Sequence, residues 1–161
     1  MKKLEEFLRS TQSALFNKLC EMYHGKSIYV KGKFILIKGN APLLLVAHLD
    51  TVHKQSVRDI CTSADGNILM SPQGIGGDDR CGVYALVNAY KLSAIKPYLL
   101  FTCNEEKGEM KAKAFSRCLD KLPYELSNLK CIVEIDRKGS RDAVYYDCDN
   151  SDFEKYKKQG I

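Results

Sequence analysis

The sequence predicts an α/β fold, a three-layer sandwich around a mixed, largely parallel central sheet. Three short, almost wholly apolar runs are typical of buried strands, and they cover residues 43–47, 98–103 and 131–135. Segments with helical periodicity separate these runs, an alternation that favours parallel strands. Two hairpin patterns add antiparallel strands, so we expect a mixed sheet.

The other elements follow from local signals along the chain. Residues 2–23 repeat apolar side chains at helical spacing, and Gly25 then ends the helix. Each hairpin pattern has two extended segments around a glycine-containing turn. The two patterns occupy 27–30 with 34–38, and 57–62 with 67–70.

The second half of the chain alternates in the same way. After a glycine-rich loop at 74–77, residues 79–92 predict a helix that Pro97 separates from the next strand. A further helix is expected over 107–119. The segment 144–148 is a candidate strand, and a last helix is expected from Ser151, a suitable N-cap.

Composition excludes several classes of protein. A length of 161 residues fits one domain covering 1–161. No run of 18 apolar residues is present and the start lacks the apolar core of a signal peptide, so we expect no membrane partner. The net charge of +5 comes from scattered lysines, so we expect no nucleic-acid partner. Seven cysteines without a C-x-x-C pattern favour a reducing compartment and a cytoplasmic location.

Acidic and imidazole side chains collect where the predicted strands end. In an open α/β sheet, ligands bind beyond the carboxyl ends of parallel strands. One pocket there would collect His48, Asp50, Asp78, Glu105, Glu106 and Asp136. Taken singly, each of these residues is more often a polar strand end, a helix start or a surface ion pair. Together, five carboxylates around one imidazole would repel one another without a cation.

The ligand types indicate which cation. A mixed nitrogen and oxygen set suits zinc, one or two ions, with cobalt, manganese or nickel as alternatives. Magnesium for phosphate chemistry is disfavoured, because His48 would supply a nitrogen ligand.

The order of these motifs resembles the co-catalytic di-zinc exopeptidases of clan MH, which include aminoacylase, carboxypeptidase G and the bacterial leucyl aminopeptidases. The motifs are His-x-Asp at 48–50, Gly-Gly-Asp-Asp-Arg-x-Gly at 76–82, Glu-Glu at 105–106 and Asp136 after a strand. The resemblance covers most of residues 34–140. It implies a metal-dependent hydrolase, an exopeptidase or aminopeptidase, that cleaves peptide or N-acyl amide bonds with a metal-activated water.

The resemblance also implies a role for each residue. His48 and Asp136 would bind the first zinc, and Asp78 would bridge to the second. Glu106 would bind the second zinc, while Glu105 would be the general base. Asp50 would hold the other nitrogen of His48. The peptide between Asp78 and Asp79 would be cis.

The sequence departs from the family at the second zinc. The family's last histidine ligand comes from a later segment, but this chain has only His24, His48 and His53. Three interpretations remain open: a shortened polypeptide, a natural short form holding one tight zinc, or a ligand taken from another chain or from His53. The alternative function is a catalytically impaired relative that acts as a metal-binding interaction module. We also expect a homo-oligomer, because absent strands would leave a sheet edge uncovered.

Overall fold

The computed structural model describes residues 2–108, 112–122, 126–136, 139 and 144. Five strands form one sheet in the order β1-β2-β6-β3-β7. β3 pairs in parallel with β6 and β7, whereas β2 pairs antiparallel with β1 and β6. The predicted mixed α/β sheet is therefore confirmed. The strand bounds are Ser27–Val30 (β1), Phe34–Ile37 (β2), Leu43–His48 (β3), Tyr98–Thr102 (β6) and Cys131–Glu134 (β7).

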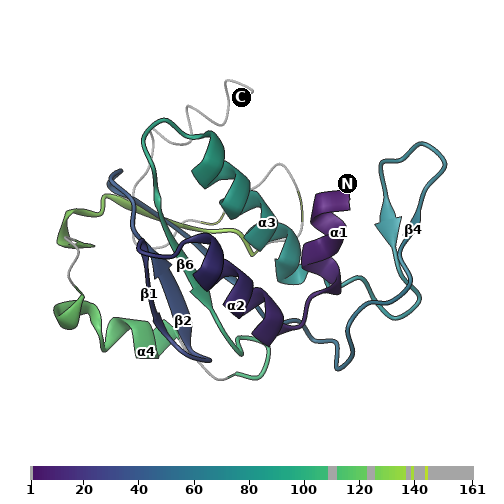
Figure 1. Ribbon diagram of the computed structural model, residues 1–161, viewed down its shortest axis with the longest axis horizontal. Helices are drawn as coiled ribbons and strands as arrows, with labels where there is room; N and C mark the ends of the chain where they lie inside the picture. Colours follow the sequence, from purple (N-terminus) through teal and green to yellow (C-terminus); the bar gives the residue numbers. More distant parts are fainter. Residues whose placement is uncertain (1, 109–111, 123–125, 137–138, 140–143, 145–161) are drawn as a thin grey trace.

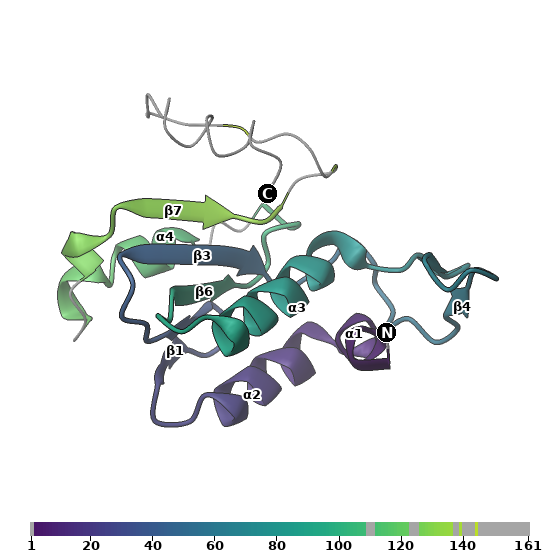
Figure 2. The same ribbon diagram turned by 90° about the horizontal axis from the view of Figure 1, so that it is seen from above.

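Helices cover both faces of this sheet and make the three layers (Figures 1 and 2). On one face lie α2 (Gln12–Met22) and α3 (Gly77–Leu92), with α1 (Lys2–Arg9) packed against α3. On the other face lies α4 (Ala112–Ser116), followed by the 3₁₀ turns η1 (Leu119–Lys121) and η2 (Leu126–Asn128).

Alternation along the strands divides the core into two clusters, because successive strand side chains point to opposite faces. In β2, Ile35 and Ile37 join the cluster with the side chains of α1, α2 and α3. Phe34 and Leu36 join the opposite cluster, which contains Phe115 of α4. Every residue of β2 is buried, as expected for a strand covered by helices on both faces of the sheet.

The single helix predicted over 2–23 is wrong, because the chain breaks into α1 and α2 at Ser10 and Thr11. The Thr11 hydroxyl accepts a hydrogen bond from the amide of Ala14 and caps α2. Arg80 Nη1 donates to the carbonyls of Phe7 and Ser10 at 3.2 and 2.7 Å. The end of α1 is therefore held by a residue 70 positions away.

Three other predictions need correction. β7 is an edge strand with alternating exposure, not a buried one, and Ile132 is 65% exposed. Among the described residues of the helix predicted over 107–119, α-helix is found at Ala112–Ser116, and 105–108 form a turn closed by the Gly108 amide on the Glu105 carbonyl. The second hairpin is shorter than predicted, and its strands are Cys61–Thr62 (β4) and Leu69–Met70 (β5).

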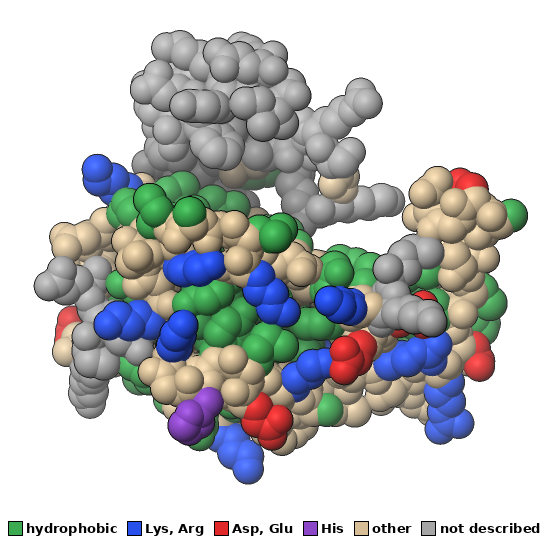
Figure 3. Space-filling model, turned by 45° about the horizontal axis from the view of Figure 1, so that its top comes forward, with side chains coloured by type: hydrophobic (Ala, Val, Ile, Leu, Met, Phe, Trp, Pro, Cys, Tyr) green, Lys and Arg blue, Asp and Glu red, His purple; other side chains and the backbone are tan. Residues whose placement is uncertain are grey.

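Two predicted elements fall almost entirely outside the described residues. The strand at 144–148 and the helix from Ser151 lie there, and only Val144 is described, without regular structure. Among the described helices, none combines the length and hydrophobicity that crossing a bilayer requires. Lys and Arg side chains lie dispersed over the face drawn in Figure 3.

Candidate metal centre

The candidate site lies at the carboxyl ends of the three parallel strands. His48 is the last residue of β3, Asp136 follows β7 by two positions, and Glu105 and Glu106 lie in the turn after β6. Asp78 reaches the same place from the start of α3. Because parallel strands end at one edge of the sheet, residues distant in sequence meet here.

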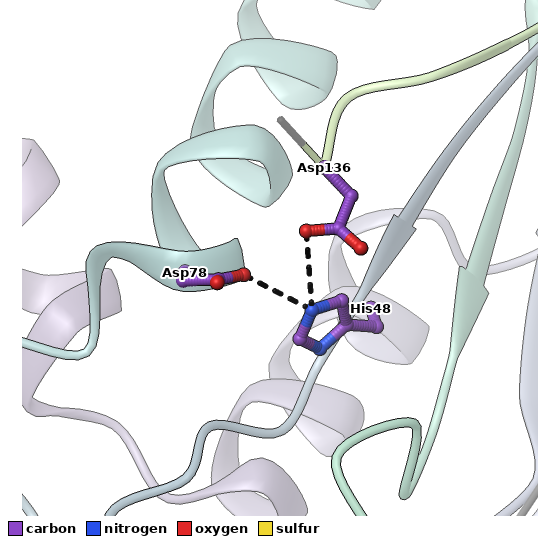
Figure 4. A group of neighbouring side chains, drawn as sticks. All are labelled: His48, Asp78 and Asp136. Atoms are coloured by element: carbon purple, nitrogen blue, oxygen red, sulfur yellow. Dashed lines mark hydrogen bonds and ion pairs between the residues drawn. The ribbon is translucent and has the colours of Figure 1, made fainter. Parts of the chain in front are cut away.

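His48 is the centre of the first group (Figure 4). Its Nε2 lies 3.3 Å from Asp78 Oδ1 and 3.8 Å from Asp136 Oδ1. Two ligand atoms on one tetrahedral zinc lie about 3.3–3.4 Å apart, given bond lengths near 2.0–2.1 Å. His48 is only 2% exposed, so its ring is held by the surrounding core. The donor types and their spacing therefore fit a divalent cation.

A second group shares the same histidine. One ligand atom each from His48, Glu105 and Glu106 lie within 4.8 Å of one another, as do those of His48, Asp78 and Asp136. His48 is thus common to both groups, and the bridging role that the resemblance implies for Asp78 stays a prediction. His53 belongs to neither group of described residues, and its ring packs against Gly74.

Asp50 connects the histidine to the glutamate turn. Its two carboxylate oxygens accept hydrogen bonds from the amides of Glu105 and Glu106, both at 3.0 Å. Oδ1 also lies 3.4 Å from His48 Nδ1. Burial alone would raise the pKa of Asp50, but the contact with His48 and the two amide hydrogen bonds lower it. Asp50 therefore stays ionised and fixes the turn, while one of its oxygens faces the imidazole.

Asp79 has a structural part that its sequence position alone did not indicate. Asp79 is buried, and its Oδ2 accepts a hydrogen bond from the backbone amide of His48 at 3.1 Å. Burial is the main reason why the pKa of Asp79 rises to about 7. The Asp78–Asp79 peptide is cis, as the resemblance implied. The one hint in the sequence was that Asp79 directly follows Asp78 in the motif at 76–82.

Gln12 is a second residue that sequence reasoning did not single out. Its side-chain amide donates to Asn104 Oδ1 at 3.1 Å and accepts from the Asn104 backbone amide at 3.0 Å. Asn104 has a left-handed backbone, with φ of 58°. The start of α2 thus contacts the residue that precedes Glu105, across 92 positions of sequence. No local sequence pattern signals this contact.

Gly82 leaves space for Asp79, which leads to a prediction about stability. A Cβ at position 82 would lie 1.9 Å from Asp79 Oδ1 and 2.7 Å from the Ile135 carbonyl. We expect Gly82→Ala to lower the free energy of unfolding by at least about 1–3 kcal/mol, as overpacking does. Urea denaturation measures this. Gly77→Ala is the matched control, because its Cβ would make only ordinary contacts from 3.5 Å; equal loss in both variants would contradict the explanation.

The charge on His48 leads to a prediction about pH. Burial would lower the pKa of His48, but the close carboxylate of Asp50 and the charges of Asp79 and Asp136 raise it to about 9, above its ordinary 6.5. A raised histidine pKa stabilises the folded state below pH 6.5, and that stabilisation is lost as the pH rises through 9.

We therefore expect the metal-free protein to lose stability between pH 6.5 and 9. Urea denaturation in the presence of a chelator measures the loss. His48→Gln should reduce the slope of stability against pH, since glutamine does not titrate. An unchanged slope in that variant would show that His48 is not the group responsible.

Two solved structures share this fold. A tripeptidase from Staphylococcus aureus subsp. aureus Mu50 superposes with a TM-score of 0.58 and 19% identity, over 84% of this chain and 42% of that one. Aminopeptidase PepT from Bacillus cereus ATCC 10987 superposes with a TM-score of 0.60 and 15% identity, over 86% of this chain and 43% of that one. The chain thus spans less than half the length of each. No family model and no curated protein matches the sequence.

Proposed function

We propose that this chain is a metal-dependent hydrolase of peptide or N-acyl amide bonds. One observation carries the proposal: a buried imidazole nitrogen faces carboxylates from the start of α3 and the end of β7. The fold, shared with part of a tripeptidase and part of an aminopeptidase, supports it. The substrate would accordingly be a peptide or an N-acyl amino acid.

His48, Asp78 and Asp136 would hold the first metal ion, with zinc as the expected ion and cobalt, manganese or nickel as alternatives. Glu106 would contribute to a second ion beside them. A bound divalent cation would lower the pKa of the attacking water and polarise the scissile carbonyl. In the metal-free protein, a protonated His48 would place a positive charge beside Asp78 and Asp136.

Glu105 is proposed as the general base. Its carboxylate lies near His48, while its backbone amide is fixed by Asp50. The carboxylate would accept the proton of the attacking water and pass it to the leaving amine. Asp50 and Gln12 would act as positioning residues, since they hold the turn that carries Glu105.

Metal-dependent hydrolysis of a substrate panel tests the proposal. Purified protein is loaded with zinc, cobalt or manganese and incubated with dipeptides, tripeptides and N-acyl amino acids, and the released amine is measured. We expect hydrolysis that a chelator abolishes and added metal restores. Stoichiometric metal binding without hydrolysis of any member would overturn the proposal.

A second candidate function is a metal-binding interaction module without hydrolysis. The small number of histidines favours it. Among the described residues, the second group has no histidine of its own: it shares His48 with the first group, and His53 belongs to neither. Metal stoichiometry separates the two functions. Two ions per chain favour catalysis, whereas a single ion favours the module; binding of no ion would contradict both functions.

A further inference from the structure

β7 forms one border of the five-stranded sheet, beside β3 (Figure 2). Ile135, which follows β7 directly, donates its backbone amide to the carbonyl of Val46 in β3. Backbone groups of alternate residues in a strand point to opposite sides, so those of Ile132 and Glu134 point away from β3. Among the described residues, no strand pairs with this side of β7. This edge can therefore accept another strand.

The exposed side chains of β7 and the residue before it form a stripe with opposite charges at its ends. Exposure alternates over 130–134, and the exposed members are Lys130, Ile132 and Glu134. Alternate residues of a strand share one face. A cation, an isoleucine that is 65% exposed and an anion therefore follow one another on the same face.

This stripe is complementary to a second copy of itself. In an antiparallel pair centred on Ile132, Ile132 faces its own counterpart, and Lys130 of each copy lies opposite Glu134 of the other. Directly opposite residues of antiparallel strands interact, and opposite charges there are stabilising. A two-fold symmetric interface requires a surface that matches itself in this way.

The other border of the sheet lacks this complementarity. β1 lies at that border, and residues 26–33 around it carry three lysines and no acidic residue. Two copies of β1 side by side would bring like charges together, and lysines commonly protect edge strands from such pairing. The charges therefore favour β7 over β1 as the edge that pairs.

We propose that two copies of this chain associate through their β7 strands, antiparallel and centred on Ile132, so that their two sheets become one. The Ile132 amide of each copy donates to the Ile132 carbonyl of the other, and two ion pairs between Lys130 and Glu134 flank this centre. The inference goes beyond the proposed function and requires neither metal nor substrate. Because one pair of strands buries little surface, we expect a weak dimer with a Kd of about 1–100 μM.

Sedimentation equilibrium of the metal-free full chain tests the proposal through its charges. Lys130→Glu and Glu134→Lys each place like charges opposite each other, so either variant alone should have a Kd raised about tenfold. Mixed together, the two variants restore both ion pairs and should associate about as tightly as the parent. Lys31→Glu, beside β1, is the control and should leave the Kd unchanged. A mixture that associates no more tightly than its separate components would contradict the proposed register.

The centre of the interface has its own test. Ile132→Lys places two cations opposite each other at the two-fold axis and should raise the Kd at least about tenfold. Ile68→Lys is the matched control, because Ile68 is 57% exposed in the hairpin of β4 and β5; it should not change the Kd. A dimer that persists in Ile132→Lys would show that another surface joins the two copies.

Hydrogen exchange distinguishes a second copy from another segment of the same chain as the occupant of this edge. We expect the Ile132 amide to exchange more slowly as the protein concentration rises through the Kd. Equal protection at every concentration would show that the edge is covered within one chain, and the proposal would then be wrong. A protein that stays monomeric throughout the expected range of Kd would overturn it as well.

Discussion

Replacing Glu105 with glutamine is expected to reduce hydrolysis by the metal-loaded protein by about 10²–10⁴-fold, the usual contribution of a general base. Glutamine keeps the size and the backbone amide that Asp50 holds, but it cannot accept a proton from water. The measurement is kcat/KM for the best substrate of the panel. Glu105→Ala should lose activity to a similar extent, because it also removes the base.

The control for this variant is Glu21→Gln, an identical chemical change on the exposed surface of α2, which should retain full activity. Zinc content and thermal stability are measured on every variant. Hydrolysis by Glu105→Gln at the rate of the parent would show that the assigned mechanism is wrong. Loss of activity together with loss of zinc would assign Glu105 to metal binding instead.

Replacing His48 with glutamine is expected to lower zinc affinity by more than about 100-fold. Loss of an outer partner of a metal ligand already costs 10–100-fold, and His48 is the member common to both candidate groups. Its Nε2 faces both Asp78 and Asp136, so the substitution removes the nitrogen ligand from the site. Competition with a chromophoric chelator measures the affinity.

His24→Gln is the matched control, because His24 is exposed just beyond α2. It should bind zinc like the parent. His53→Gln is informative in addition, because His53 was an open alternative for the second ion. Unchanged zinc affinity in His48→Gln would contradict the assignment of the site.

The elements of the fold that could be predicted from the sequence are those that a local residue pattern determines. The apolar runs at 43–47 and 98–103 predicted their strands, because a strand buried on both faces needs apolar side chains at every position. Exposure of β7 could not be predicted from its composition, since burial depends on what packs against it. The break between α1 and α2 had a local signal in Thr11, but its Arg80 contact spans 70 residues.

The candidate site was predictable to a similar degree. His48, Asp78 and Asp136 follow strand ends or precede a helix, so sheet topology alone brings them together. The contributions of Gln12 and Asp79 depend on side-chain directions and on contacts between distant segments, and periodicity carries no information about either. His48 as the member common to both groups also emerged only from the distances.

Anomalous scattering from a crystal grown with zinc tests the central claim most directly, because it locates each ion and its ligands together. A zinc ion bonded to His48 Nε2 and to carboxylate oxygens of Asp78 and Asp136 is the predicted result. Zinc bound elsewhere, or no zinc in a well-ordered site, would contradict the account.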